Sequence, residues 1–290
     1  MGMKKPEIHS FFDERTFTAT HLVSDPETGK AAIIDPVLDF DLSSGRTNTA
    51  SADSLIALVK QRSYSVEWIL ETHIHADHLS SAPYLQQQLG GKTGVSNAVP
   101  LIQKSFGDIF NAGSEFATDG SQFDHLFADD EAFSLGGVEA KVMHTPGHTP
   151  ACAVYIFGDA AFVGDTLFMP DFGSARCDFP GGDARTLYNS IQKILALPDE
   201  TRLFTCHDYK APGRDQFAWE STVAEQHENN VHLGGSISEE AFVKMREERD
   251  AQLSMPKLIL PAVQVNMRAG KMPPPEDNGV SYLKLPVNAV

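Results

Sequence analysis

Residues 17–22 alternate between apolar and polar side chains, and residues 30–34 form a short apolar run. Both patterns are typical of β-strands, since alternate side chains of a strand point to opposite faces. The segment between them, residues 24–29, contains Pro26 and Gly29. Proline presets φ and glycine adopts positive φ, so this segment favours a turn. The pattern therefore predicts a β-hairpin near the N-terminus.

The next stretch changes from polar to apolar. Residues 38–52 are polar and rich in Gly, Ser, Thr and Asn, which predicts a loop that is long enough to have a function. Residues 53–60 have apolar positions at helical spacing, with Asp53 suited to the N-cap position. A short apolar run at residues 66–70 predicts a buried strand. Residues 79–89 have helical spacing again, which ends at a pair of glycines.

The second half of the chain predicts further strands and one more amphipathic helix. We expect a mixed α/β fold, of the α+β class, in which sheets pack face to face and helices lie on the outside. We expect one domain over residues 1–290, with a core of about residues 10–235. Residues 236–290 are expected to form a C-terminal extension of one charged helix, residues 238–252, followed by Pro-rich coil. The predicted strands of this half are residues 138–143, 152–157, 161–163 and 202–205, and the predicted helix is residues 184–195.

Composition and charge narrow the range of partners. The 290 residues are 41% hydrophobic, which is enough for a real core. A net charge of −16 repels nucleic acid and anionic membrane surfaces, so we expect neither as a partner. A small anionic substrate would need cations supplied by its own pocket. Three widely spaced cysteines, no apolar run of membrane length and no visible secretory signal lead us to expect a cytoplasmic protein.

Four side chains of metal-ligand type lie within six positions, directly after the strand predicted at residues 66–70. His73 and His75 are two residues apart, so in an extended segment they point the same way. Asp77 and His78 follow, and we expect them at the start of the next helix. Ligands in α/β structures gather at the carboxyl ends of strands. This run therefore predicts a metal site.

Three more candidate ligands follow other predicted strands. His148 lies just past the strand that ends near residue 143, Asp165 ends residues 161–165, and His207 ends residues 203–207. Imidazole and carboxylate groups suit zinc or non-haem iron. His144 lies in the same short motif as His148, and we expect it to be structural.

The order of these residues resembles the metallo-β-lactamase superfamily. The resemblance covers about residues 10–235 and implies an αββα sandwich with the metal site at one edge. Further motifs are similar to those of the persulfide dioxygenases, and the long segment at residues 38–52 resembles bacterial β-lactamase-like hydrolases. The motifs that carry the narrower resemblance are Gly164-Asp165-Thr166-Leu167, Arg176-Cys177-Asp178-Phe179, His207-Asp208-Tyr209 and Val265-Asn266-Met267-Arg268.

The narrower resemblance implies one iron(II) per chain, held by His73, His148 and Asp165. Two histidines and one carboxylate leave three positions open on non-haem iron. The implied reaction converts glutathione persulfide and O₂ into sulfite and glutathione. The remaining candidate ligands would then line the site without holding a second metal, and these are His75, Asp77, His78 and His207.

Substrate contacts are expected from Arg176 and Tyr209. Glutathione carries two carboxylates and the chain is strongly acidic, so a local cation is needed, and an arginine fork matches a carboxylate. The alternative for Arg176 is a surface ion pair, with Asp178 as its partner.

Two other functions are left open by the sequence. A binuclear zinc hydrolase of the glyoxalase II type would use all seven ligand-type residues and a metal-bound water to cleave a glutathione thioester. A metal-dependent thiol or persulfide sensor would use Cys177, whose thiolate could be activated by Arg176; the alternative is that Cys177 is a small buried residue. The oligomeric state, monomer or homodimer, also stays open.

Overall fold

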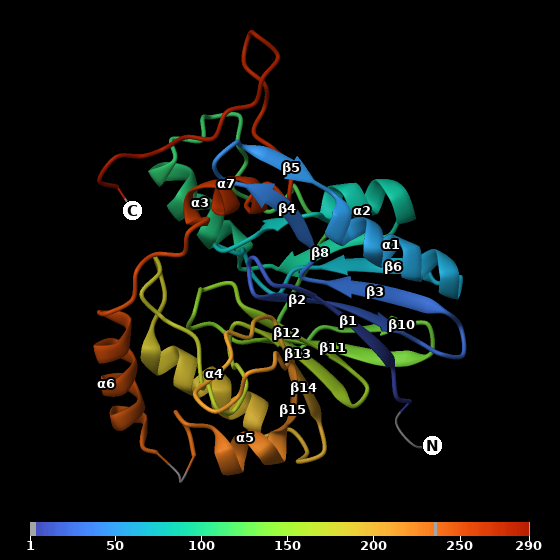
Figure 1. Cartoon of the computed structure of the whole chain (residues 1–290), viewed down its shortest axis with the longest axis vertical. Helices are drawn as coiled ribbons and strands as arrows, with labels where there is room; N and C mark the ends of the chain where they lie inside the picture. The colour runs from blue at the N-terminus through green and yellow to red at the C-terminus, as the bar shows by residue number, and fades with distance from the viewer. Residues whose placement is uncertain (1–3, 235–236, 290) are drawn as a thin grey trace.

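Two six-stranded sheets pack face to face at the centre of the computed structural model, which describes residues 4–234 and 237–289 (Figure 1). The first sheet has the order β1-β2-β3-β6-β8-β9, and the second has the order β10-β11-β12-β13-β14-β15. The strands of the first sheet are β1 (Glu7–Asp13), β2 (Thr18–Ser24), β3 (Lys30–Ile34), β6 (Ser65–Leu70), β8 (Lys92–Ser96) and β9 (His125–Phe127). Those of the second are β10 (Ala132–Leu135), β11 (Val138–His144), β12 (Ala153–Phe157), β13 (Ala160–Gly164), β14 (Arg202–Thr205) and β15 (Glu220–Thr222).

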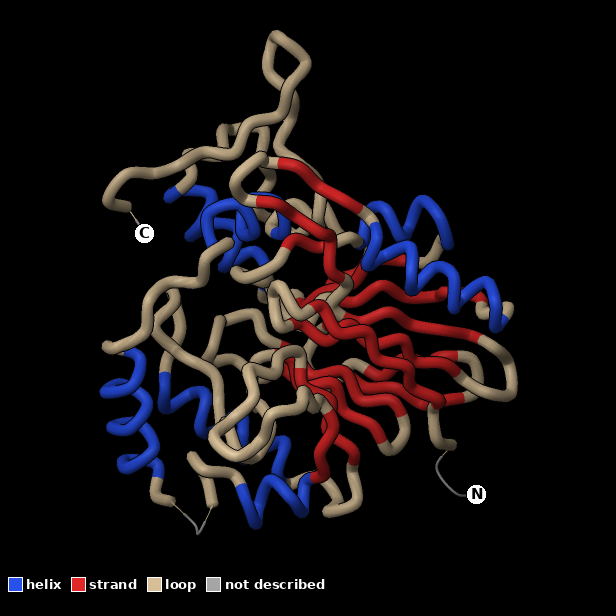
Figure 2. The backbone as a smooth tube through the Cα atoms, in the orientation of Figure 1, coloured by secondary structure: helices blue, strands red, loops and turns tan. Residues whose placement is uncertain are grey.

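Helices cover the outer face of each sheet (Figure 2). Helices α1 (Ala50–Arg62) and α2 (Ala82–Leu89) pack on the first sheet. Helices α4 (Ala184–Leu195), α5 (Val223–Asn229) and α6 (Glu239–Asp250) pack on the second. The four layers confirm the predicted αββα sandwich. Helices α3 (Val99–Ile109) and α7 (Ile259–Asn266) share a further apolar cluster beside the sandwich.

The predicted apolar patterns explain the best-defined elements. In β11, Val138, Ala140 and Val142 are buried between the sheets while the residues between them are exposed. In α4, apolar side chains recur at helical spacing, and the Asp183 side chain accepts a hydrogen bond from the Thr186 N–H as the N-cap. Burial of one face therefore fixes both elements. The N-terminal hairpin is also confirmed, because β2 and β3 pair antiparallel.

The prediction of a loop at residues 38–52 is wrong. Strand β4 (Val37–Asp41) pairs with β5 (Arg46–Asn48) and with β7 (Leu79–Ser80) in a small third sheet. All three residues of β5 are exposed, so this strand has no hydrophobic pattern to reveal it. The pairing of β4 with β7 joins segments about forty residues apart, which no local pattern reports.

The predicted starts of two helices also need correction. Helix α1 begins at Ala50 after Thr49, and Asp53 lies in its first turn, where its carboxylate accepts hydrogen bonds from the Thr49 and Tyr84 hydroxyls. A carboxylate there is favoured by the helix dipole without being the cap. Helix α2 begins only at Ala82, so Asp77 and His78 precede it in a loop. Pro83 is in the first turn, the part of a helix that tolerates proline.

The C-terminal segment packs into the rest of the molecule. The charged helix is confirmed as α6, whose Phe242 is fully buried. The prediction of coil after it is wrong for Ile259–Asn266, where α7 forms and almost all residues are buried. Residues 271–289 contain no helix or strand, as predicted. A helix that is apolar on all sides is a buried one, and it lacks the amphipathic pattern that reveals surface helices. Ser236, the expected first residue of the extension, lies outside the described residues. Over the described part of the chain, no helix has the length and apolar character needed to span a membrane.

Candidate metal centre

All seven predicted ligands lie together at one end of the sandwich. His73, His75, Asp77 and His78 belong to the loop between β6 and β7. The other three follow the ends of β11, β13 and β14, and the parallel pairing of β13 with β14 brings Asp165 and His207 to the same edge. The prediction that strand ends gather these side chains is therefore confirmed.

The first group of candidate ligands consists of His73, His148 and Asp165. Their ligand atoms lie within 4.8 Å of one another, and all three residues are buried. The Nε2 atoms of His73 and His148 lie 3.8 Å and 3.7 Å from Asp165 Oδ2. These separations are too long for hydrogen bonds. They match donors that each approach one shared metal ion at about 2 Å.

The imidazole of His148 is oriented by the backbone of a neighbouring loop. Its Nδ1 atom donates a hydrogen bond to the carbonyl oxygen of Arg176 at 2.8 Å. The lone pair of Nε2 then faces Asp165, as a metal ligand requires. His73 is oriented in a similar way, because its Nδ1 lies 3.0 Å from the Thr72 hydroxyl.

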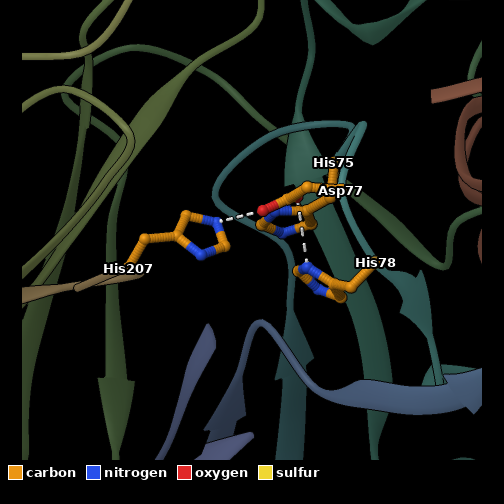
Figure 3. A group of neighbouring side chains, drawn as sticks. All are labelled: His75, Asp77, His78 and His207. Atoms are coloured by element: carbon orange, nitrogen blue, oxygen red, sulfur yellow. Dashed lines mark ion pairs between the residues drawn. The ribbon is translucent and has the colours of Figure 1, made fainter. Parts of the chain in front are cut away.

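The second group consists of His75, Asp77, His78 and His207 (Figure 3). Asp77 lies at its centre, 2.9 Å from His207 Nε2 and 3.4 Å from His78 Nδ1. The two groups meet at Asp165, whose Oδ1 lies 3.5 Å from His207 Nε2. One carboxylate thus faces both groups.

Buried polar atoms without a partner test whether this donor set fits a metal. His75 Nδ1, His78 Nε2 and Asp165 Oδ1 are buried and have no hydrogen-bond partner among the described residues. Leaving such an atom unpaired costs about 1–3 kcal/mol. A metal cation would satisfy these lone pairs, and imidazole with carboxylate is a donor set for zinc or iron. The residues therefore fit a metal ion.

The pKa values of the histidines in the site are shifted in opposite directions. Burial lowers the pKa of His207, but the carboxylates of Asp77 and Asp165 outweigh burial and raise it to about 9. Burial and then the charge of His75 lower the pKa of His73 well below its usual value, and the same two causes lower that of His78 to about 4. Neutral imidazoles are the form that binds metals. The carboxylates that favour a proton on His207 would equally favour a metal cation.

Two residues that we did not select from the sequence hold the ligand loop in place. Asp35 lies 2.9 Å from His75 Nε2 and accepts hydrogen bonds from the N–H and hydroxyl of Thr72. Burial lowers the pKa of His75, and the Asp35 carboxylate more than compensates and raises it well above its usual value. The signal for Asp35 was available, since it directly follows the strand at residues 30–34, as other site residues follow theirs.

Asn266 is the second of these residues, and it belongs to α7. Its amide donates to the carbonyl oxygens of His75 and His78, at 2.9 and 2.7 Å, and its Oδ1 accepts from the Ser80 N–H. Asn266 occurs in one of the motifs of the family resemblance, but its contact with the ligand loop depends on the buried helix that the sequence pattern did not predict.

The two predicted substrate residues lie beside candidate metal ligands, but they differ in their exposure and in their partners. The Tyr209 ring stacks on His207, with centroids 5.8 Å apart, and the residue is 41% exposed. The Arg176 guanidinium donates to both carboxylate oxygens of Asp178, each at 2.6 Å, and to the Ser254 carbonyl. The ion pair expected as the alternative for Arg176 is therefore present.

Two further expectations concern residues outside the ligand set. His144 has a structural environment, since its Nε2 lies 3.0 Å from the Phe127 carbonyl and its N–H donates to Asp129. Cys177 is buried, and burial raises the pKa of its thiol. Arg176 is engaged by Asp178, and the nearby charge of Arg246 lowers the pKa of the thiol by less than burial raises it. The environment of Cys177 therefore does not favour the sensor.

A family model described as the metallo-beta-lactamase superfamily matches residues 15–207, a range that contains all seven ligand-type residues. The chain belongs to the metallo-β-lactamase superfamily. This superfamily member is 54% identical to a "Probable metallo-hydrolase" of Burkholderia pseudomallei, over 98% of the chain and 99% of that protein. It is 55% identical to a "Beta-lactamase hydrolase-like protein" of Agrobacterium fabrum, of which it spans 65%.

The chain is also similar to persulfide dioxygenases, at lower sequence identity but over most of its length. The superfamily member is 31% identical to "Persulfide dioxygenase ETHE1, mitochondrial" of Bos taurus, over 92% of the chain and 90% of that protein. The crystal structure of ETHE1 from Myxococcus xanthus is 29% identical and superposes with a TM-score of 0.71, over 91% of this chain and 99% of that one. These relatives confirm both resemblances, to persulfide dioxygenases and to β-lactamase-like hydrolases.

Proposed function

We propose that this protein is a persulfide dioxygenase that converts glutathione persulfide and O₂ into sulfite and glutathione at one iron(II) per chain. The observation that carries the proposal is the group of His73, His148 and Asp165, in a chain similar to ETHE1 over nine-tenths of its length. Two histidines and one carboxylate are the ligand set of non-haem iron oxygenases with open positions. Iron held there would supply the electron transfer that no side chain provides.

The side chains around this group have distinct roles in the proposal. His73, His148 and Asp165 would hold the iron, and all three side chains are buried. Asp35 holds His75 and Thr72, so it fixes the loop from which His73 projects. When the S–S bond breaks, glutathione would depart as the thiol, and the outer sulfur would leave as sulfite with two oxygen atoms from O₂ and one from water. The four electrons that this sulfur loses would pass to O₂, and two protons would be released.

Recognition of the glutathione body would fall to Tyr209 and Arg176. The exposed Tyr209 ring offers a flat surface beside His207, and Arg176 is the cation whose backbone orients His148. The substrate carboxylates would compete with Asp178 for the Arg176 guanidinium. An anionic substrate gains from such a cation in a chain with a net charge of −16.

A binuclear zinc hydrolase acting on a glutathione thioester is the second candidate. The observation that favours it is a set of buried atoms with no hydrogen-bond partner within residues 4–234 and 237–289. These are His75 Nδ1 and His78 Nε2 of the second group, next to Asp165 Oδ1. A second metal would satisfy them, and two metals held there would supply an acidified water that could attack a carbonyl carbon. Relatives named as a metallo-hydrolase and a hydrolase-like protein support this candidate.

Metal content separates the two candidates. Protein purified without added metal should contain about one iron per chain by elemental analysis, and the Asp165→Ala variant should contain none. Two zinc ions per chain, with rapid cleavage of a glutathione thioester in the absence of oxygen, would establish the hydrolase instead. Asp130→Ala is the control, because it removes an exposed carboxylate that contacts only Lys141 and no candidate ligand.

A further inference from the structure

A buried ion pair on α6 lies outside the site described above. Arg246 is 1% exposed and Asp250 is 6% exposed, and the Arg246 Nε and Nη2 atoms donate to Asp250 Oδ1 at 3.0 and 2.6 Å. Each side chain of the pair has one further hydrogen-bonding group, and both groups bind the same loop. Arg246 Nη1 donates to the Ser174 carbonyl at 3.0 Å, and Asp250 Oδ2 accepts from the Cys177 N–H at 2.8 Å.

The loop that this pair holds carries the partner of a candidate metal ligand. Arg176 lies between the two contact points, and its carbonyl oxygen is the acceptor for His148 Nδ1 at 2.8 Å. The segment after α6 adds a further contact, because the Ser254 carbonyl accepts from Arg176 Nη1. A displacement of the loop would therefore move the acceptor that orients the His148 imidazole.

We propose that Arg246 and Asp250 are positioning residues that orient His148 through the loop at residues 174–177. A buried ion pair is a poor source of stability, since apolar side chains of similar volume often stabilise as well or better. Its geometric value is specific: one carboxylate and one guanidinium each have a hydrogen-bonding group left over, and both groups bind the same loop. The proposal rests on His148 being a metal ligand and holds for either of the two candidate reactions.

The consequence for the metal follows from the orientation of the ring. When the partner of a ligating imidazole is lost or displaced, metal affinity typically falls about 10- to 100-fold. The loss arises because the Nε2 lone pair no longer has a fixed direction toward Asp165, from which it lies 3.7 Å. Helix α6 would in this way set the affinity of the centre without touching the metal.

The test replaces the pair with apolar side chains, Arg246→Met with Asp250→Leu, so that no unpaired charge stays buried. Cobalt(II) is titrated into the metal-free protein, and its visible absorption spectrum reports affinity and ligand geometry. We expect affinity about 10- to 100-fold weaker than in the parent and an altered spectrum. The control is Lys244→Met on the same helix, whose exposed contact with Glu248 is 3.9 Å long; it should leave both unchanged.

Two further measurements distinguish positioning from a general loss of structure. Urea unfolding of the metal-free proteins establishes that the double variant is folded. In a His148→Ala background, the double replacement should leave the remaining cobalt affinity unchanged, since the pair acts through His148. Parent-like affinity and spectrum in the folded double variant would overturn the proposal.

If the double variant does not fold, Arg246→Lys decides. Lysine keeps the charge but cannot reproduce the fork that binds both Asp250 and the Ser174 carbonyl. We expect cobalt affinity below that of the parent, with an altered spectrum, and an unchanged affinity and spectrum would overturn the proposal.

Discussion

His207 Nδ1 donates a hydrogen bond to the carbonyl oxygen of Phe17 at 3.1 Å. Phe17 has a positive φ of 58°, a conformation that is strained for a bulky residue. The same carbonyl oxygen accepts from the Asp208 N–H, and the Phe17 ring lies 5.5 Å from that of Tyr209. The turn between β1 and β2 therefore orients one candidate ligand and forms part of the wall beside it.

Replacing Phe17 with proline should weaken metal binding, because proline fixes φ near −65° and would move the carbonyl away from His207. We expect iron affinity to fall about 10- to 100-fold, as when the partner of a histidine near a metal is lost. Phe17→Gly is the matched control, since glycine adopts positive φ readily. Equal affinity in the two variants would show that this backbone conformation does not support His207.

The two ligand groups should respond differently to loss of a carboxylate. Asp165→Ala should abolish iron retention through dialysis, because Asp165 Oδ2 faces both His73 and His148. Asp77→Ala should weaken retention by only about 10- to 100-fold, since we assign Asp77 to the lining of the site. Iron content after exhaustive dialysis measures both. Complete loss in both variants would contradict the assignment to a single iron.

Asn266→Ala should destabilise the fold. The substitution leaves the carbonyls of His75 and His78 and the Ser80 N–H without partners in a buried place. Each unpaired group costs about 1–3 kcal/mol, so the free energy of unfolding should fall by at least about 2 kcal/mol in urea. Asn278→Ala removes an exposed asparagine and should change it by less than about 0.5 kcal/mol. If Asn266→Ala lowers the free energy of unfolding as little as Asn278→Ala does, α7 does not support the ligand loop.

Arg176→Ala should raise KM for glutathione persulfide more than it lowers kcat. The glutathione body is bound alike in the ground and transition states, so the loss appears mainly in KM. Arg62→Ala, at the C-terminal end of α1, is a control for general charge effects. Steady-state kinetics measure both constants. An unchanged KM would show that Arg176 does not bind the substrate. Its roles would then be the ion pair with Asp178 and the backbone contact with His148.

Local patterns predict the parts of this fold that local burial determines. Strand β3 and helix α4 have the predicted bounds, because an apolar run and a helical apolar stripe with an Asp cap each specify one structure. Strands β4 and β5 and helix α7 have no such pattern. Their stability comes from pairing with, or burial against, residues far along the chain.

The site shows the same division. The rule that strand ends gather ligands predicts that His148, Asp165 and His207 lie together, and in the structure these residues lie close to the run that begins at His73. Asp35 and the loop contacts of Asn266 depend on how separate segments pack, which periodicity does not encode. The engagement of Arg176 by Asp178 is local, and the sequence offered it as an alternative.

Oxygen uptake tests the central claim most directly. Iron-loaded protein is given fresh glutathione persulfide in an oxygen electrode, and sulfite is assayed in the same sample. The dioxygenase assignment predicts that O₂ is consumed and sulfite is released in equal amounts, and that the Asp165→Ala variant does neither. Fully iron-loaded protein that consumes no oxygen, yet cleaves a glutathione thioester rapidly under anaerobic conditions, would contradict the assignment.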